Sequence, residues 1–215
     1  MSTDTKQVVT EEKPVEEKPV EEKPVEEKPA AKPAAKPAAK PAAKPAAKPV
    51  ELPAFEKSIS DKVVEKFGDK IQVEFVKENR VGIKVNREDV HDVAEFIRDG
   101  LNYDHVESVS GVDYPQDKEI EVVYHIGSYS DSSLAKQILV LTTRAQREEN
   151  PIPGKDATKL PTLRDIFYSV EFHEREVFEM FGVYFTGHPD NRRLLLPEDW
   201  ADLPPLRKDF AIKGR

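Results

Sequence analysis

The apolar residues of this chain recur with two different periods, and each period predicts one kind of element. Apolar and polar residues alternate over residues 71–76, and an apolar stretch returns at residues 81–85. Residues 105–113, 120–129 and 138–143 are three further strand candidates, so five strands are predicted. The turn residues Asn79 and Lys118 fall between neighbouring strands. The strand that begins at Ile138 is apolar on both faces, which indicates a central or helix-covered position. We therefore expect a mainly antiparallel sheet with helices packed on it, an α+β fold.

Helical spacing of apolar residues appears before and after the first pair of strands. One stripe repeats every fourth residue and stops before Gly68; it comprises Phe55, Ile59, Val63 and Phe67. A second helix follows Asn86, which we expect to cap it, with Asp89 three residues on. The inner face of this helix comprises Val90, Val93, Ala94, Ile97 and Leu101, with Gly100 near its end.

A third helix is predicted from Leu163 to Phe181, where apolar residues again share one face. We expect Thr162 to cap its start and Gly182 to end it. Residues 183–185 then form a short extended piece. Residues 187–191 are rich in turn formers and are expected to return the chain toward the helix.

The third helix carries charged residues on both of its faces. Glu174 falls within the apolar stripe, so its carboxylate requires a partner or a raised pKa. We expect Arg192 and Arg193 to supply that partner as a guanidinium fork. On the same phase, Glu176 and Glu179 point away from the stripe, where a neighbouring subunit can reach them. Two interpretations of the cluster stay open, namely internal ion pairs that fix the turn and a surface for another subunit.

The first fifty residues have a different composition. A Glu-Glu-Lys-Pro-Val repeat gives way near Ala30 to Ala-Ala-Lys-Pro, and a proline recurs every four or five residues from Pro14 to Pro49. Proline blocks helix continuation, and the segment lacks large apolar residues. We expect residues 1–50 to form a disordered arm rich in Pro, Lys, Glu and Ala, either a solvated spacer or a tether to a partner. Residues 51–150 are then an α+β core, and residues 151–215 hold the charged helix and a docking segment of the same domain.

Charge and cysteine content exclude several classes of function. Residues 51–215 hold 23 of the 33 basic and 32 of the 41 acidic residues, so their formal charge is −9. Nucleic acid is therefore not an expected partner. The chain has no cysteine, which excludes disulfides and thiolate ligands for zinc or iron–sulfur clusters. No apolar run approaches the ~20 residues that a bilayer span requires, so we expect any membrane association to be indirect.

Two catalytic interpretations fit the charged helix poorly. The run from His173 to Val177 is similar to a zinc-protease helix, but a valine stands where the second histidine ligand would be. An independent enzyme would instead have to use Glu174, His188 and Arg192 together. A third possibility is a free adaptor that recruits partners through its arm.

The charged residues also follow one long spaced pattern. Glu174-Arg-Glu176 is followed by Glu179, by His188 and by Arg192, and the tail near Phe210 reads Pro-Leu-Arg-Lys-Asp-Phe. This pattern resembles the thirty-kilodalton subunit, also called the C subunit, of respiratory complex I and related membrane oxidoreductases. The resemblance is dense from about residue 161 to residue 210. It assigns a structural or interface role to Glu174, Arg175, Glu176, Glu179, His188, Arg192, Arg193, Arg207, Lys208 and Asp209.

The resemblance implies a non-redox scaffold in the peripheral arm of a complex I-like, proton-pumping quinone oxidoreductase, with no activity of its own. Its expected partners are the D-type subunit, of the forty-nine-kilodalton class, and the iron–sulfur subunits of the B and I types. Iron–sulfur clusters and quinone would belong to those partners, with no catalytic, cofactor or metal site in this chain. The expected location is the cytoplasmic side of the cell membrane, peripheral and held through the complex. An alternative is the same subunit in an archaeal dehydrogenase complex fed by a reduced deazaflavin or by ferredoxin.

Overall fold

The computed structural model describes residues 53–149, 158–200 and 203–212. The predicted arm lies outside these ranges. The three α-helices of the described part are α1 (Ala54–Phe67), α2 (Val90–Leu101) and α3 (Val170–Phe181). The first two lie where helical spacing predicted them, and the predicted inner face of α2 is buried throughout.

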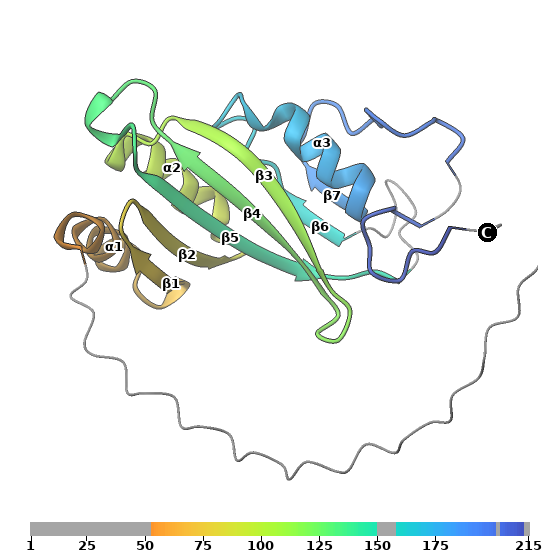
Figure 1. Cartoon of the computed structure of the whole chain (residues 1–215), viewed down its shortest axis with the longest axis horizontal. Helices are drawn as coiled ribbons and strands as arrows, with labels where there is room; N and C mark the ends of the chain where they lie inside the picture. Colours follow the sequence, from red (N-terminus) through yellow and green to blue (C-terminus); the bar gives the residue numbers. More distant parts are fainter. Residues whose placement is uncertain (1–52, 150–157, 201–202, 213–215) are drawn as a thin grey trace, which may run out of the picture. The chain divides into compact units, whose positions relative to one another are not determined.

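A five-stranded sheet forms the centre of this part of the chain. Its strands are β1 (Ile71–Lys77), β2 (Arg80–Asn86), β3 (His105–Tyr114), β4 (Glu119–Gly127) and β5 (Ile138–Gln146). All five lie at the predicted positions, and their order in the sheet is β1-β2-β5-β4-β3 (Figure 1). The apolar strand β5 is central, as its sequence indicated. It pairs parallel with β2 and antiparallel with β4, so the sheet is mixed but mainly antiparallel.

A second, two-stranded sheet accompanies the C-terminal third of the chain. It joins β6 (Thr158–Pro161) in parallel with β7 (Val183–Thr186). The extended piece after Gly182 was predicted and is confirmed as β7. Its partner β6 was not predicted, because its residues Thr-Lys-Leu-Pro include only one large apolar side chain and end in a proline.

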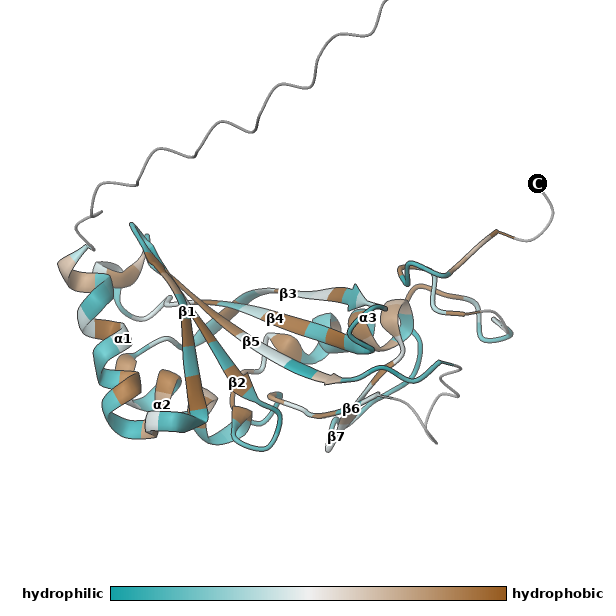
Figure 2. Ribbon diagram, turned by 90° about the horizontal axis from the view of Figure 1, so that it is seen from below, coloured by the Kyte–Doolittle hydropathy of each residue, from teal (hydrophilic) through white to brown (hydrophobic). Residues whose placement is uncertain are grey.

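The helices share one face of the large sheet. Ile83 of β2 and Tyr124 of β4 both lie opposite Leu141 of β5, so these three buried side chains point to the same side. They belong to one hydrophobic core with residues of α1, α2 and α3. Contacts place α1 against β1 and β2, and α3 against the other edge strand, β3 (Figure 1). Figure 2 shows the alternation of hydrophobic and hydrophilic residues along β1 and β2 that this one-sided burial requires.

Two helix starts differ from the sequence prediction. Asn86 does not cap α2, because it is still in the β2 ladder opposite Arg144, and a turn intervenes before Val90. Helix α3 begins at Val170 rather than Leu163, since residues 162–169 form turns. The predicted glycine stop is confirmed: Gly182 follows α3 in the left-handed conformation, with φ of 75°.

Candidate functional site

The side chain of Glu174 in α3 is completely buried at the centre of the C-terminal third. Its Oε1 accepts hydrogen bonds from the backbone N–H of Leu163 (2.9 Å) and the hydroxyl of Tyr124 (3.1 Å). Its Oε2 accepts one from the Thr162 hydroxyl at 2.5 Å. Burial raises the pKa of this carboxyl to about 7, although the three donors act in the opposite direction. Thr162 is thus a ligand of the buried carboxyl and not the cap of a helix.

His188 lies beside this carboxyl, with its Nε2 atom 3.9 Å from Oε2 of Glu174. The same nitrogen donates to the carbonyl oxygen of Glu171 (3.0 Å), while Nδ1 accepts from the backbone N–H of Asp190 (3.0 Å). One donated and one accepted bond fit a neutral imidazole that carries its proton on Nε2. Neither side chain of the Glu174–His188 pair is exposed to solvent, so a substrate has no access to it.

Arg192 does not join that pair. Its guanidinium is 86% exposed and forms an ion pair with Asp190 (2.8 Å), which holds the pKa of that aspartate well below its usual range. The predicted fork from Arg192 and Arg193 to Glu174 is therefore wrong. The three residues that an independent enzyme would need are not brought together.

Two other arginines fix the backbone that follows β7. Arg175 of α3 donates to the carbonyl oxygens of Arg192 and Arg193, both at 3.0 Å. Arg193 in turn donates to the carbonyl oxygens of Pro197 (2.8 Å) and Trp200 (2.7 Å). The turn returns the chain to the helix as predicted, but guanidinium–carbonyl bonds hold it there.

Glu179 was predicted to face outward, and this is also wrong. Its side chain is buried, and its carboxylate accepts the backbone N–H groups of Leu194 (3.0 Å), Leu195 (2.8 Å) and Leu196 (3.0 Å). Successive amides that converge in this way form a concave anion site, here occupied by a carboxylate of the same chain. The phase of α3 could not show this, because the returning chain covers that face of the helix.

Arg207 ties the end of the chain to α3. It is 2% exposed and donates to the carbonyl oxygens of Phe181 (2.6 Å) and Glu148. Its Nη2 atom is buried and has no hydrogen-bond partner among the described residues. Burial, together with the nearby positive charge of Arg147, lowers the pKa of Arg207 to about 10.

A buried ion pair completes this anchor. Asp113 of β3 accepts from Nε of Arg147 (2.7 Å) and from the backbone N–H of Lys208 (2.9 Å). Arg147 also contacts Asp209 at 2.6 Å. Neither Asp113 nor Arg147 was among the residues predicted from the sequence. The pattern along the chain holds no signal for Asp113, because Val106 and Val112 of the same predicted strand have the opposite phase.

These bonds leave several apolar side chains exposed on α3 and on the segments tied to it. The exposed residues are Phe172, Leu194, Leu195, Leu206 and Ile212. Glu176 of α3 is exposed as well, as its phase predicted. Most of the other charged residues of the motif thus bind the chain to itself, while apolar residues remain available to another molecule. Such a combination is typical of a protein-binding surface.

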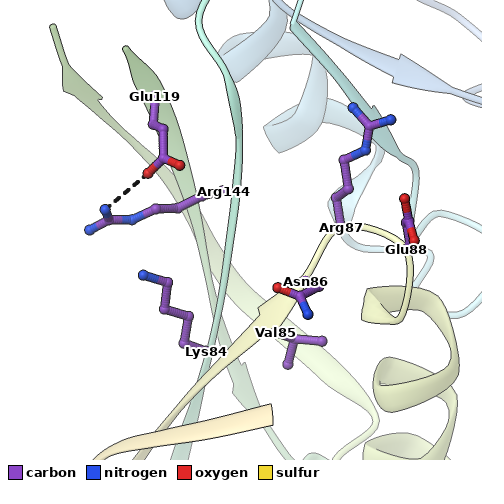
Figure 3. Close-up of a pocket in the computed structure, with 7 residues that line it drawn as sticks. All are labelled: Lys84, Val85, Asn86, Arg87, Glu88, Glu119 and Arg144. Carbon is purple, nitrogen blue, oxygen red and sulfur yellow. Dashed lines mark hydrogen bonds and ion pairs between the residues drawn. The ribbon is translucent and has the colours of Figure 1, made fainter. Parts of the chain in front are cut away.

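A polar hollow of about 490 Å³ lies at the end of β2 and was not predicted. Figure 3 shows Lys84 and Arg144 beside it, with Arg144 directed at Glu119. Arg144 contacts Glu119 at 3.1 Å and Glu121 at 2.5 Å, so its charge is neutralised within the chain.

Within the described residues, no group of three or more potential ligands for a metal ion is present. In the same part of the chain, every helix is too short or too polar to cross a membrane.

Comparison with known proteins gives consistent matches. The family model described as "Respiratory-chain NADH dehydrogenase, 30 Kd subunit" matches residues 83–215. The C subunit of the F(420)H(2) dehydrogenase of Methanosarcina mazei is 35% identical over 131 residues, which cover 61% of this chain and 75% of that protein. The C subunit of the NADH-quinone oxidoreductase of Chlorobium phaeobacteroides is 35% identical over 156 residues, covering 71% and 87%.

A solved structure is also similar. It comes from the membrane-bound sulfane sulfur reductase, described as an archaeal respiratory membrane complex. The similar chain has a TM-score of 0.57 and 26% sequence identity, and the match covers 73% of this chain and 86% of that one.

Proposed function

Because this chain belongs to the family of the 30 Kd subunit of respiratory-chain NADH dehydrogenase, we propose that it is a non-redox scaffold subunit of a complex I-like oxidoreductase. In this role it holds the D-type subunit and the iron–sulfur subunits of the B and I types in register. Register matters because a misplacement of about 1 Å near reacting groups can lower a rate a hundredfold. The complex is membrane-bound, and the proposed place of this subunit is its cytoplasmic side.

One observation carries the scaffold role. Most charged residues of the motif make hydrogen bonds within the chain. Glu174, Glu179 and Arg207 are buried and hydrogen-bonded to turns and backbone. Such groups give a surface segment a fixed shape without placing a reactive group in solvent. The exposed apolar residues on the same segment supply the contact area. Clusters and quinone then belong to the partner subunits.

A second candidate is the same role in a complex with a different electron donor. The relative from Methanosarcina mazei is an F(420)H(2) dehydrogenase subunit, and the similar solved structure is an archaeal respiratory complex. The name of the Methanosarcina relative supports a reduced deazaflavin as the alternative donor to NADH, and ferredoxin stays the other alternative. The scaffold role is unchanged in either case.

Purification of the tagged full chain from native membranes tests the proposal. We expect the iron–sulfur subunits and the D-type subunit to co-purify in fixed proportion. Assay of the pure complex with NADH, reduced deazaflavin and reduced ferredoxin then identifies the donor. Separation of the subunits should leave flavin and iron with the partners. Recovery of the chain by itself, or of a prosthetic group bound to it, would contradict the scaffold role.

A further inference from the structure

Strand β3 ends the large sheet on the side of α3 (Figure 1). Ten residues long, it pairs only with β4. On its other side, the N–H of Val106 donates to the hydroxyl of Ser169. From residue 107 to residue 112, no further described residue hydrogen-bonds to the backbone along this free edge. β3 therefore presents a row of backbone donors and acceptors without partners from the described part of the chain.

The two edges of the sheet differ in their protection. At the opposite edge, β1 has a bulge between Val73 and Phe75 and carries the exposed charges of Glu74 and Lys77. Bulges and charges are the devices by which proteins prevent an edge strand from pairing with other chains. β3 also has a bulge, between Val106 and Ser108, and the exposed charge of Glu107, but both precede residues 109–112, which are Val-Ser-Gly-Val without charge or proline. This stretch is suited to accept another strand.

An apolar hollow of about 250 Å³ lies between this edge and α3. It is lined by Val109 and Gly111 of β3, by Val177, Met180 and Phe181 of α3, and by Leu206. A Cβ atom at Gly111 would lie 2.5 Å from the ring of Phe181, so the missing side chain lets helix and strand approach closely. An exposed sheet edge with a pocket for alternate side chains beside it is the arrangement that binds extended peptides by strand addition.

We propose that an extended segment of a partner subunit adds to β3 as a further strand and places an apolar side chain in this hollow. The proposal rests on the scaffold role, since it requires a stable partner. The exposed acid Glu176 lines the hollow, Glu107 lies two residues before Val109 on β3, and residues 51–215 carry a formal charge of −9. The added segment therefore carries lysine or arginine beside its apolar anchor.

The other possible strands fit less well. The chain's own residues 14–49 contain a proline every four or five positions, and proline lacks the amide that a sheet ladder requires. A second copy of this chain would bring one acidic domain, of formal charge −9 over residues 51–215, against another of the same charge. Like charges at an interface oppose association.

Photo-crosslinking in the intact complex tests the added strand. A benzoylphenylalanine placed at Ser110 of β3, which is exposed at the hollow, is compared with one at Gln72 on the protected edge strand β1. We expect Ser110 to crosslink to one contiguous segment of another subunit, with an apolar and a basic residue at alternate positions, and Gln72 to give no such product. A product with a second copy of this chain, with residues 1–52, or no product in an intact complex would overturn the proposal.

A charge reversal gives an independent test. Glu176→Lys should lower retention of the full chain in the complex about tenfold, which corresponds to ~1.4 kcal/mol, with a smaller loss at high salt. Glu65→Lys, on the exposed side of α1, is the matched control and should leave retention unchanged. Equal retention of the two variants would contradict the proposed strand addition but not the scaffold role. If the wild-type chain does not co-purify with any iron–sulfur subunit, the scaffold role itself fails.

Discussion

Glu174 illustrates how far a single position can be inferred from the pattern around it. Its phase on the third helix predicted a buried carboxyl with a partner or a raised pKa, and the structure confirms the burial and the raised pKa. The partners are Thr162, Leu163 and Tyr124 rather than arginines. Helical periodicity describes only the helix itself. It holds no information on which turn folds back over a given side chain.

The same carboxyl makes stability depend on pH. Its folded pKa of about 7 lies above the ordinary value of 4.5, so the folded state keeps a proton that the unfolded state loses. The contribution of this carboxyl to the free energy of unfolding is fully present below about pH 4.5. It falls by about 3 kcal/mol as the pH rises to 7. Glu174→Gln should remove this part of the slope.

Urea unfolding of the purified full chain between pH 4.5 and pH 8 measures the difference. Glu176→Gln serves as the control, because Glu176 is exposed and should leave the slope unchanged. A Glu174→Gln variant whose stability changes with pH as the wild type does would show that the buried carboxyl does not titrate in this range.

At the scale of elements, local patterns located most helices and strands but not their long-range pairing. Five strands and the apolar face of α2 follow from periodicity. The predicted stripe of α1 is confirmed at Ile59 and Val63, whereas Phe55 is exposed and Glu56 beside it is buried. The parallel pairing of β2 with β5 depends on segments more than fifty residues apart. The early start predicted for α3 failed because residues 162–169 use their polar groups in turns that hold Glu174.

The contact of β3 with α3 yields an element-scale prediction. Gly111→Ala places a methyl group 2.5 Å from the ring of Phe181, which is itself part of the core. We expect a loss of about 1–3 kcal/mol in the free energy of unfolding, because the helix must shift away from the strand. Ser110→Ala is the neighbouring control, since Ser110 is exposed and its replacement creates no clash.

Thermal and denaturant unfolding of the two variants give the comparison directly. The control substitution should leave the unfolding midpoint close to that of the wild type, whereas Gly111→Ala should lower it. Equal stability of the two variants would mean that α3 is not packed against β3 at this distance.

At the scale of the whole molecule, the C-terminal third combines a rigid interior with an apolar exterior. Glu179 and Arg207 bind the returning chain to α3, and Phe172 and Leu195 remain exposed. The motif that identifies the family could be recognised from the sequence, but the roles of its residues could not. Most of its charges act within the chain, and only the folded arrangement shows which side chains remain for a partner.

The amount and the turnover of the assembled complex, measured together, test the central claim most directly. Phe172→Asp removes an exposed apolar contact on α3, and Phe55→Asp makes the same change on α1, where the phenylalanine is similarly exposed. We expect Phe172→Asp to lower the amount of assembled complex at least about tenfold, because a charge in an apolar interface is costly. Quinone reductase turnover per assembled complex should stay at the wild-type value, and Phe55→Asp should change neither quantity. Normal assembly with a lost turnover would contradict the account, because the residue would then serve the reaction and not the assembly.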